Sequence, residues 1–358
     1  MRVFVHEFMT SGAMSGEAMP PSLLREGLAM RQAVAAAFLD LPGVRVVTTS
    51  DPRVPPAAIA GLEDIVARDA AAEADLFRTQ CSEADRCLII APEIDGELQR
   101  RVSQAVELAG RERVLNSPGL VAAASDKWET YLRLKRAGVP TIETRLGSSD
   151  ESRTWDLPIV KPRLGAGSQN VMRLSRRETA LPTDFPWSRT GLDDRPERWI
   201  VQPFVSGRWL SCSILFRPGG GIDVWPPAEQ RISTDGTFAY LGGVLPAACD
   251  AAAIQSLTLR AIRAVAPDDQ NLAGPIGVDL VEDAATGELL VCEVNPRFTT
   301  SFVAARERAG GNLLAGLLWP DAEPAAWKAG RVEFDAAGAI TLTRTQPAAE
   351  PSLPPTEY

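Results

Sequence analysis

The sequence predicts a mixed α/β fold, with an open α/β unit at the N-terminus and an α+β unit after it. Two observations support this prediction. Short apolar runs alternate with helical segments through about residue 116, which is typical of open α/β domains. A short strand, a glycine-containing loop and a strand hairpin follow. With 358 residues, the chain is long enough for two or three packed units.

The first unit begins with short strands expected at residues 3–8 and 44–48. Between them, residues 22–39 follow two prolines and carry apolar side chains on one helical face, so this segment is expected to be a helix. Residues 87–92 form an apolar run that ends at a proline, which predicts a buried strand. We therefore expect an α/β domain over residues 1–116.

The second unit is expected to begin with a helix. Asp126 can cap the N-terminus of this helix together with Glu129, and Gly138 can end it. Residues 157–162 are then expected to form a short strand that leads into a glycine-containing loop. This part of the chain, residues 117–198, is expected to be a small subdomain.

A strand hairpin is predicted in the last third of the chain. Residues 277–281 and 288–295 are apolar segments on either side of the turn-forming residues 283–287. We expect a larger subdomain over residues 199–345, followed by a disordered, proline-rich tail at 346–358.

The predicted hairpin carries side chains that could bind a metal ion. Glu293 and Asn295 are two residues apart on a strand and therefore share a face. If the turn is centred on residue 285 or 286, Asp279 lies on the same face, but a shift of half a residue moves it to the opposite face. Three hard oxygen donors of this kind suit Mg²⁺. The alternative is an exposed hairpin with solvated acids.

Three cations and a glycine loop are candidates for binding an anion. Arg297 follows the strand, where its guanidinium could hold a carboxylate or a phosphate, or form an ordinary surface ion pair. Lys127 lies in the first turn of its helix, where a nearby anion would offset the helix dipole. Lys161 ends a buried strand, so its ammonium needs a partner. Residues 165–168 could present backbone N–H groups to phosphate, although such a loop is as often a hairpin turn.

Composition narrows the classes of function. The formal charge of −9 argues against general affinity for nucleic acid or an anionic membrane. The apolar runs are too short to span a bilayer and the five cysteines lack a metal-binding spacing, so we expect a cytoplasmic protein with reduced thiols and no membrane partner. The single histidine, His6, lies in the first expected strand. Catalysis must therefore use carboxylates, lysines, arginines and a bound ion, because a Ser-His-Asp triad needs an imidazole beside other catalytic groups.

Taken in order, these features resemble the ATP-grasp superfamily. The shared features are Lys127 on a helix, Lys161 followed by a glycine loop, a connector at residues 202–207, Asp279, and the run at residues 293–297. The resemblance implies that ATP is the cofactor, with two Mg²⁺ ions that Mn²⁺ could replace. It also implies that a carboxylate is phosphorylated to an acyl phosphate and then joined to an amine, with release of ADP and phosphate.

The resemblance implies a role for individual residues. Those expected to contact ATP lie on the helix, the strand, the glycine flap and the hinge: Lys127, Lys161, Gly165, Gly167, Ser168, Gln202, Pro203, Phe204 and Val205. The implied metal ligands are Asp279, Glu293 and Asn295, and the implied catalytic residues are Arg297 and Lys161. The hinge departs from the usual pattern, because Gln202 replaces a common glutamate.

A narrower resemblance connects segments at residues 7–12, 21–27, 240–243 and 295–301 with the tyramine–glutamate ligases of methanofuran biosynthesis and their bacterial relatives in methylofuran synthesis. It implies that L-glutamate and an aromatic amine or amino acid, tyramine or tyrosine, are joined as a γ-glutamyl amide. Weaker candidates for substrate contacts are Gln230, Arg231, Arg306, Ser11 and Tyr240.

Two alternatives stay open on the sequence alone. The first keeps the fold and changes the acceptor, giving an amino acid ligase or a peptide-tail ligase. The second is a non-catalytic ATP-binding regulatory protein, against which Glu293 and Asn295 argue, because a protein that only binds nucleotide has less need of a two-metal site. A homodimer would be in keeping with most symmetric assemblies.

Overall fold

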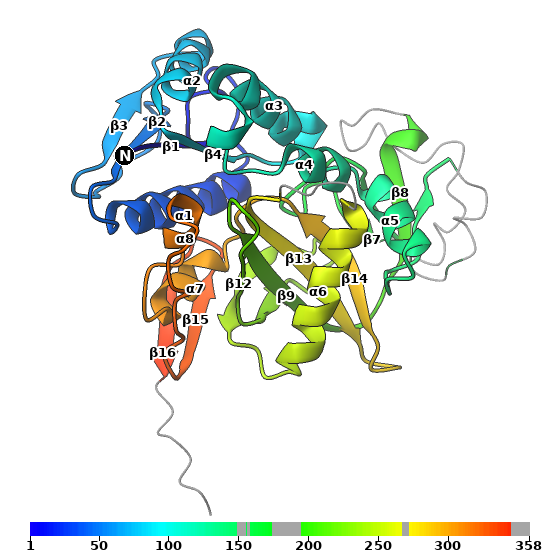
Figure 1. The fold of residues 1–358 in the computed structure, drawn as a ribbon. Helices are drawn as coiled ribbons and strands as arrows, with labels where there is room; N and C mark the ends of the chain where they lie inside the picture. Colours follow the sequence, from blue (N-terminus) through cyan, green and yellow to red (C-terminus); the bar gives the residue numbers. More distant parts are fainter. Residues whose placement is uncertain (149–154, 156–157, 174–194, 267–271, 345–358) are drawn as a thin grey trace, which may run out of the picture.

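The residues described by the computed structural model (Figure 1) are 1–148, 155, 158–173, 195–266 and 272–344. They form three β-sheets with helices packed against them, which confirms the mixed α/β class. The predicted tail at residues 346–358 lies outside the described residues. The boundaries expected near residues 116 and 198 stay predictions.

Four parallel strands form the first sheet, in the order β3-β2-β1-β4. The strand bounds are Arg2–Glu7 (β1), Arg45–Ser50 (β2), Glu63–Val66 (β3) and Arg86–Ile90 (β4). Val3 and Val5 share a buried cluster with α1 (Pro21–Leu39), whereas Phe4 shares one with α2 (Ala70–Glu83) and α3 (Glu97–Ala109). Helices thus cover both faces of the sheet, which explains why its central strands are continuous apolar runs.

A small antiparallel sheet follows, in the order β5-β8-β6-β7. Its strands are Arg145–Leu146 (β5), Pro158–Pro162 (β6), Met172–Arg173 (β7) and Trp199–Pro203 (β8). Two helices precede it, α4 (Pro118–Ala124) and α5 (Lys127–Arg136). The Asp126 carboxylate accepts hydrogen bonds from the backbone N–H groups of Trp128 and Glu129 at 2.9 and 3.3 Å, which confirms the predicted helix cap.

The large sheet has the strand order β14-β13-β9-β11-β12-β15-β16, and β10 pairs with β9 outside this path. Its strands are Gly207–Phe216 (β9), Ile222–Val224 (β10), Ala228–Ile232 (β11), Tyr240–Leu245 (β12), Gly274–Asp283 (β13), Leu289–Asn295 (β14), Arg331–Asp335 (β15) and Ile340–Arg344 (β16). The later helices are α6 (Ala251–Val265), α7 (Phe302–Arg308) and α8 (Ala315–Leu318), and Figure 1 shows α6 lying along β9, β13 and β14. Single 3₁₀ turns occur at Ile94–Gly96 (η1), Arg111–Arg113 (η2) and Pro196–Arg198 (η5).

Alternation along the strands gives the large sheet two different faces. Leu210 and Cys212 of β9 and Val278 and Leu280 of β13 share a buried cluster with α6. The residues between them in sequence, such as Asp279, project from the other face. The sheet therefore packs against a helix on one face and carries polar side chains on the other.

A bulge sets the register of the predicted hairpin. Near the turn, Leu280 of β13 pairs with Val291 of β14. The register shifts between Asp279 and Leu280, so that Asp279 pairs with Glu293 and Cys292 is the extra residue of β14. Without the extra residue, the turn-side register would place Asp279 opposite Cys292. The bulge thus brings Asp279 and Glu293 into direct cross-strand alignment.

His6 is a core residue. Its side chain is fully buried, its ring lies edge-on to Phe77, and its Nδ1 is 3.8 Å from a Glu73 oxygen. Burial, together with the charge of Arg101, lowers the pKa of the imidazole well below its usual value. None of the helices in the described part of the chain has both the length and the apolar composition needed to traverse a lipid bilayer.

Candidate active site

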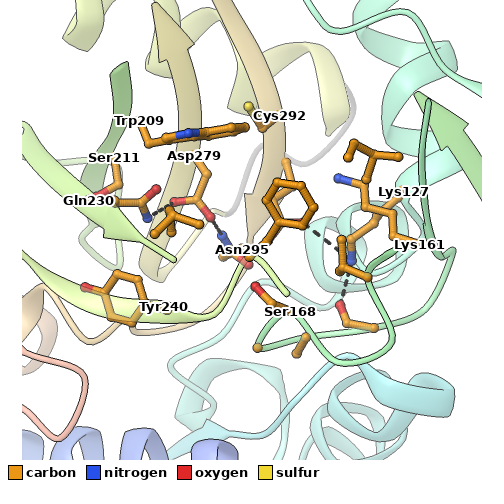
Figure 2. A pocket seen from close by; sticks show the side chains of 18 of the residues that line it. Lys127, Lys161, Ser168, Trp209, Ser211, Gln230, Tyr240, Asp279, Cys292 and Asn295 are labelled. Carbon is orange, nitrogen blue, oxygen red and sulfur yellow. Dashed lines mark hydrogen bonds and ion pairs between the residues drawn. The ribbon is translucent and has the colours of Figure 1, made fainter. Parts of the chain in front are cut away.

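One cavity gathers residues from all parts of the fold (Figure 2). Its walls include Glu26 of α1, Lys161 of β6, the glycine loop at residues 165–168, Gln230 of β11 and Asp279 of β13. The cavity therefore lies where the first unit, the small sheet and the large sheet meet.

Asp279 is at the centre of the acidic wall. Its carboxylate accepts hydrogen bonds from Nε2 of Gln230 at 2.8 Å and from Nδ2 of Asn295 at 2.9 Å. Burial and the facing charge of Glu293 raise the pKa of Asp279 to about 7, despite both hydrogen bonds. Two carboxylates thus face each other beside the Asn295 amide, and a bound cation would offset the repulsion between the carboxylates.

Two lysines face this wall from the small sheet and its helix. Nζ of Lys127 lies 3.6 Å from a Glu293 oxygen and donates a hydrogen bond to the Gly165 carbonyl at 2.6 Å. The expected anion beside Lys127 is therefore Glu293. Burial lowers the pKa of Lys161, although the charge of Glu293 opposes this shift. For Glu293 itself, burial acts to raise the pKa, but Lys127, Lys161 and Arg297 together outweigh burial and lower it.

The glycine loop rests on the start of α1. Gly167 has a φ of +60°, which favours glycine, and a Cβ atom there would lie 2.4 Å from Cδ2 of Leu23, so the Leu23 side chain would have to move. Nε2 of Gln169 donates a hydrogen bond to the Ser22 hydroxyl at 2.8 Å. The loop thus connects the small sheet with the first unit across one side of the cavity.

The hinge lines the cavity from β8 onward. Gln202, Pro203, Phe204 and Val205 all border it. The Gln202 side chain donates a buried hydrogen bond to the Thr144 hydroxyl at 2.8 Å. Glutamine at this position therefore has a structural partner, and the neighbouring backbone remains available to a ligand.

Arg297 borders the cavity, but its guanidinium already has a partner. It forms two hydrogen bonds to the carboxylate of Glu93, at 2.9 and 3.0 Å, and the side chains are 11% and 4% exposed. Burial alone would lower the pKa of Arg297, but Glu93 raises it. Glu93 belongs to the first unit, so the pair joins that unit to the end of β14.

Protein-family comparison assigns both parts of this architecture. Residues 124–301 match the model of the ATP-grasp domain, and residues 44–119 match that of the pre ATP-grasp 3 domain. The chain belongs to the ATP-grasp superfamily. All lining residues of the cavity except Glu26 lie within residues 124–301, and Glu26 comes from α1 of the first unit.

Solved structures share the ATP-grasp fold of this chain. A crystal structure of an ATP-grasp superfamily protein from Archaeoglobus fulgidus matches with a TM-score of 0.67 at 25% identity, over 93% of this chain and 92% of that one. N5-carboxyaminoimidazole synthetase from Staphylococcus aureus, solved with ADP, matches with a TM-score of 0.65 at 14% identity, over 93% and 82%. L-amino acid ligase from Bacillus licheniformis matches with a TM-score of 0.62 at 15% identity, over 93% and 78%. The last two likenesses show the fold alone.

A curated relative matches only in part. A segment of 93 residues, 26% of this chain, is 28% identical to the uncharacterized protein MG011 homolog of Mycoplasma pneumoniae. The match spans 30% of the length of that relative.

The five weaker substrate candidates divide into two groups. Gln230 and Tyr240 line the cavity. Arg231 instead points away from Gln230 and donates to the Phe334 carbonyl at 2.9 Å, and Arg306 pairs with Asp40 at 2.9 Å on the surface. Ser11 is buried in the first unit, where its hydroxyl donates to the Phe8 carbonyl at 3.1 Å. None of these three lines this cavity.

Several cavity residues were not predicted from the sequence. They include Glu26, Trp209, Phe238, Cys292 and Thr299. Trp209 lies close to the predicted connector at residues 202–207, and Thr299 lies close to the predicted run at residues 293–297. Glu26 lies within one of the segments of the narrower resemblance. Position in the sequence therefore gave a partial indication that these residues belong to the site. Cys292 reaches the cavity because of the bulge, which the residue pattern does not reveal.

Proposed function

We propose that this protein is an ATP-dependent carboxylate–amine ligase that releases ADP. The observation that carries the proposal is the facing arrangement of Lys127 and Lys161 against Asp279, Glu293 and Asn295 in one cavity bordered by a glycine loop. Such a cavity offers cations for phosphate, acids for a metal ion and space for a second substrate.

The acidic wall fits Mg²⁺. In the described residues no three His, Cys, Asp or Glu side chains cluster as a complete metal site. Mg²⁺ usually takes one or two carboxylates and fills its remaining positions with water and nucleotide phosphates, so Asp279, Glu293 and Asn295 are a sufficient protein contribution. When bound, Mg²⁺ would neutralise charge on the phosphates and on the transferring phosphoryl group. Two ions, with Mn²⁺ as a substitute, are part of this proposal.

Under this proposal, individual residues of the protein bind the nucleotide, exclude water and stabilise charge. Lys127 and Lys161 hold the nucleotide phosphates, and the loop containing Gly165, Gly167 and Ser168 excludes water above them. The hinge backbone receives the adenine. Arg297, fixed in orientation by Glu93, stabilises charge on the transferring phosphoryl group. The substrate carboxylate attacks the γ-phosphorus, and the acyl phosphate formed then reacts with the amine.

We further propose glutamate as the acid and tyramine or tyrosine as the amine, giving a γ-glutamyl amide. The segments at residues 7–12, 21–27, 240–243 and 295–301 support this choice. Three of them contribute to the cavity, the second through Glu26, the third through Tyr240 and the last through residues such as Thr299. Homodimerisation and a cytoplasmic location stay predictions.

Incubation with ATP, Mg²⁺, L-glutamate and either tyramine or tyrosine tests the proposal. We expect ADP release that depends on both substrates, and a γ-glutamyl amide in the mass spectrum. ADP release with a different amine would support a ligase with another acceptor. Nucleotide binding without turnover for any acid–amine pair would overturn the ligase proposal and favour a regulatory ATP-binding protein.

A further inference from the structure

Glu26 is the one carboxylate on the cavity wall without a partner among the described residues. Three carboxylates line the cavity: Glu26, Asp279 and Glu293. Asp279 accepts two hydrogen bonds and Glu293 lies 3.6 Å from Lys127. A carboxylate without a partner on a cavity wall is suited to a cationic ligand, because water alone compensates only in part for the desolvation cost of its partial burial.

The local structure fixes Glu26 in this position. The next residue, Gly27, packs against the carboxylate of Glu7, and a Cβ atom at Gly27 would lie 2.7 Å from that group. On the other side, the start of α1 contacts the glycine loop, and Oε1 of Glu26 lies 3.8 Å from the Cβ position of Gly167. Glu26 is thus held between the first unit and the loop, at the edge of the cavity.

The surroundings of Glu26 suit an ammonium group. Burial raises the pKa of its carboxyl to about 7, with Glu93 adding to the shift and Arg297 and Arg25 opposing it. Arg297 is close enough to act through its charge but forms its ion pair with Glu93 instead. Burial and the charge of Glu26 raise the pKa of Tyr240, so the phenol stays neutral beside it. An aromatic ring next to a carboxylate favours a cation through its π face.

The position of Tyr240 in the cavity can be compared with that of the two lysines proposed to bind phosphate. Figure 2 shows Tyr240 across the cavity from Lys127 and Lys161, beside Gln230. The Tyr240 end of the cavity therefore lies away from these two lysines. An ammonium bound at this end would be separated from both of them.

We propose that Glu26 binds the ammonium group of the amine substrate and takes one proton from it before amide formation. This inference rests on the proposed ligase function. The carboxylate becomes a carboxylic acid, and the freed lone pair on nitrogen forms the C–N bond with the acyl carbon. The C–O bond to phosphate breaks with its electron pair on phosphate, which also receives the second proton from nitrogen.

Two different nucleophiles distinguish a role of Glu26 in deprotonating the amine from a role in forming the acyl phosphate. Tyramine must be deprotonated before it attacks, whereas hydroxylamine is uncharged at neutral pH and traps an acyl phosphate as a hydroxamate without a base. For Glu26→Gln, we expect amide formation to fall by about 10²-fold or more, with hydroxamate formation near the wild-type rate. Glu17→Gln, which removes an exposed carboxylate from the same unit, should leave both rates unchanged.

Each other outcome is decisive. Unchanged amide formation in Glu26→Gln overturns the proposal, and so does an equal loss of amide and hydroxamate, which would place Glu26 at the acyl donor. Absence of hydroxamate from the wild-type protein defeats the ligase proposal instead. In that case the binding step can still be tested by calorimetric titration of tyramine into the protein in the presence of an ATP analogue. We expect Glu26→Gln to weaken tyramine binding about 10-fold. Equal affinity of the variant and the wild type overturns the proposed role of Glu26 in binding. Glu26→Asp, which keeps the charge, should retain part of that affinity.

Discussion

Asp279 and Glu293 lie directly opposite each other on β13 and β14, because the bulge at Cys292 moves the ladder by one residue just before they meet. In isolation this alignment is unfavourable, since each carboxylate repels the other. The repulsion makes the pair a receptive place for a divalent cation. The electrostatic repulsion between the two carboxylates would be relieved by a bound cation, and this relief would add to the binding free energy of the cation.

Replacing Glu293 with glutamine should remove the dependence of nucleotide binding on Mg²⁺. The side chain keeps its size but loses the charge that we propose holds the ion, and we expect turnover to fall by about 10²-fold or more. Calorimetric titration with ATP, with and without Mg²⁺, measures the first effect. Glu288→Gln, an exposed change beside the same hairpin turn, is the matched control. A Glu293→Gln protein that releases ADP at the normal rate would refute the metal assignment.

Glu93→Gln should destabilise the protein and reduce its activity together. The amide cannot balance the charge of buried Arg297, and loss of one partner of such a pair costs about 3 kcal/mol. Thermal denaturation and steady-state kinetics measure the two effects. Asp40→Asn breaks the exposed pair with Arg306, where we expect a cost below ~1 kcal/mol and no change in activity. Equal effects of the two variants would argue against a special role for the buried pair.

Gly167→Ala should weaken ATP binding through the loop. The alanine strains the backbone at positive φ, and its Cβ meets the end of the Leu23 side chain, so the contact between the loop and α1 has to rearrange. We expect the KM for ATP to rise about 10-fold. Gly43→Ala introduces similar strain at a φ of +72° but has nothing within 4 Å of the new Cβ atom. If both variants raise KM equally, backbone strain elsewhere, not the loop contact, would explain the result.

Glu26→Gln should change how stability depends on pH. The folded carboxyl has a pKa of about 7 against an ordinary value of 4.5, so the unfolded chain releases this proton at lower pH. The wild-type group therefore lowers the free energy of unfolding as pH rises from 4.5 towards 7, by about 3 kcal/mol at most. The variant lacks this loss, and its Tm relative to wild type should be higher at pH 8 than at pH 5. A difference that does not change with pH, or that matches Glu17→Gln, would contradict the pKa shift.

Strong local signals made much of the fold predictable. Prolines before a helical pattern located α1, and the cap at Asp126 located α5 to within a residue. β3 is half exposed and α2 is rich in alanine and charged residues, so neither has the apolar periodicity that reveals an element from sequence.

The site was predictable where one sequence motif holds several of the residues that line the cavity. Glu293 and Asn295 share a face by strand geometry alone, but the position of Asp279 depends on a bulge that no residue pattern announces. Glu26 lines the cavity from a different unit, and Glu93 of that unit binds Arg297 on the cavity wall. Both depend on contacts between segments far apart in the sequence. Arg306 was assigned by residue type, and its partner Asp40 lies 266 residues away.

The buried pair of Glu93 and Arg297 has a consequence for building hybrid proteins. One partner comes from the first sheet's connecting segment and the other from the hairpin end, so the boundary between the units passes through the cavity wall. Exchanging the first unit for that of a relative would leave a buried guanidinium without its counter-charge unless both positions were transferred together. A hybrid protein should therefore keep Glu93 and Arg297 together as a pair.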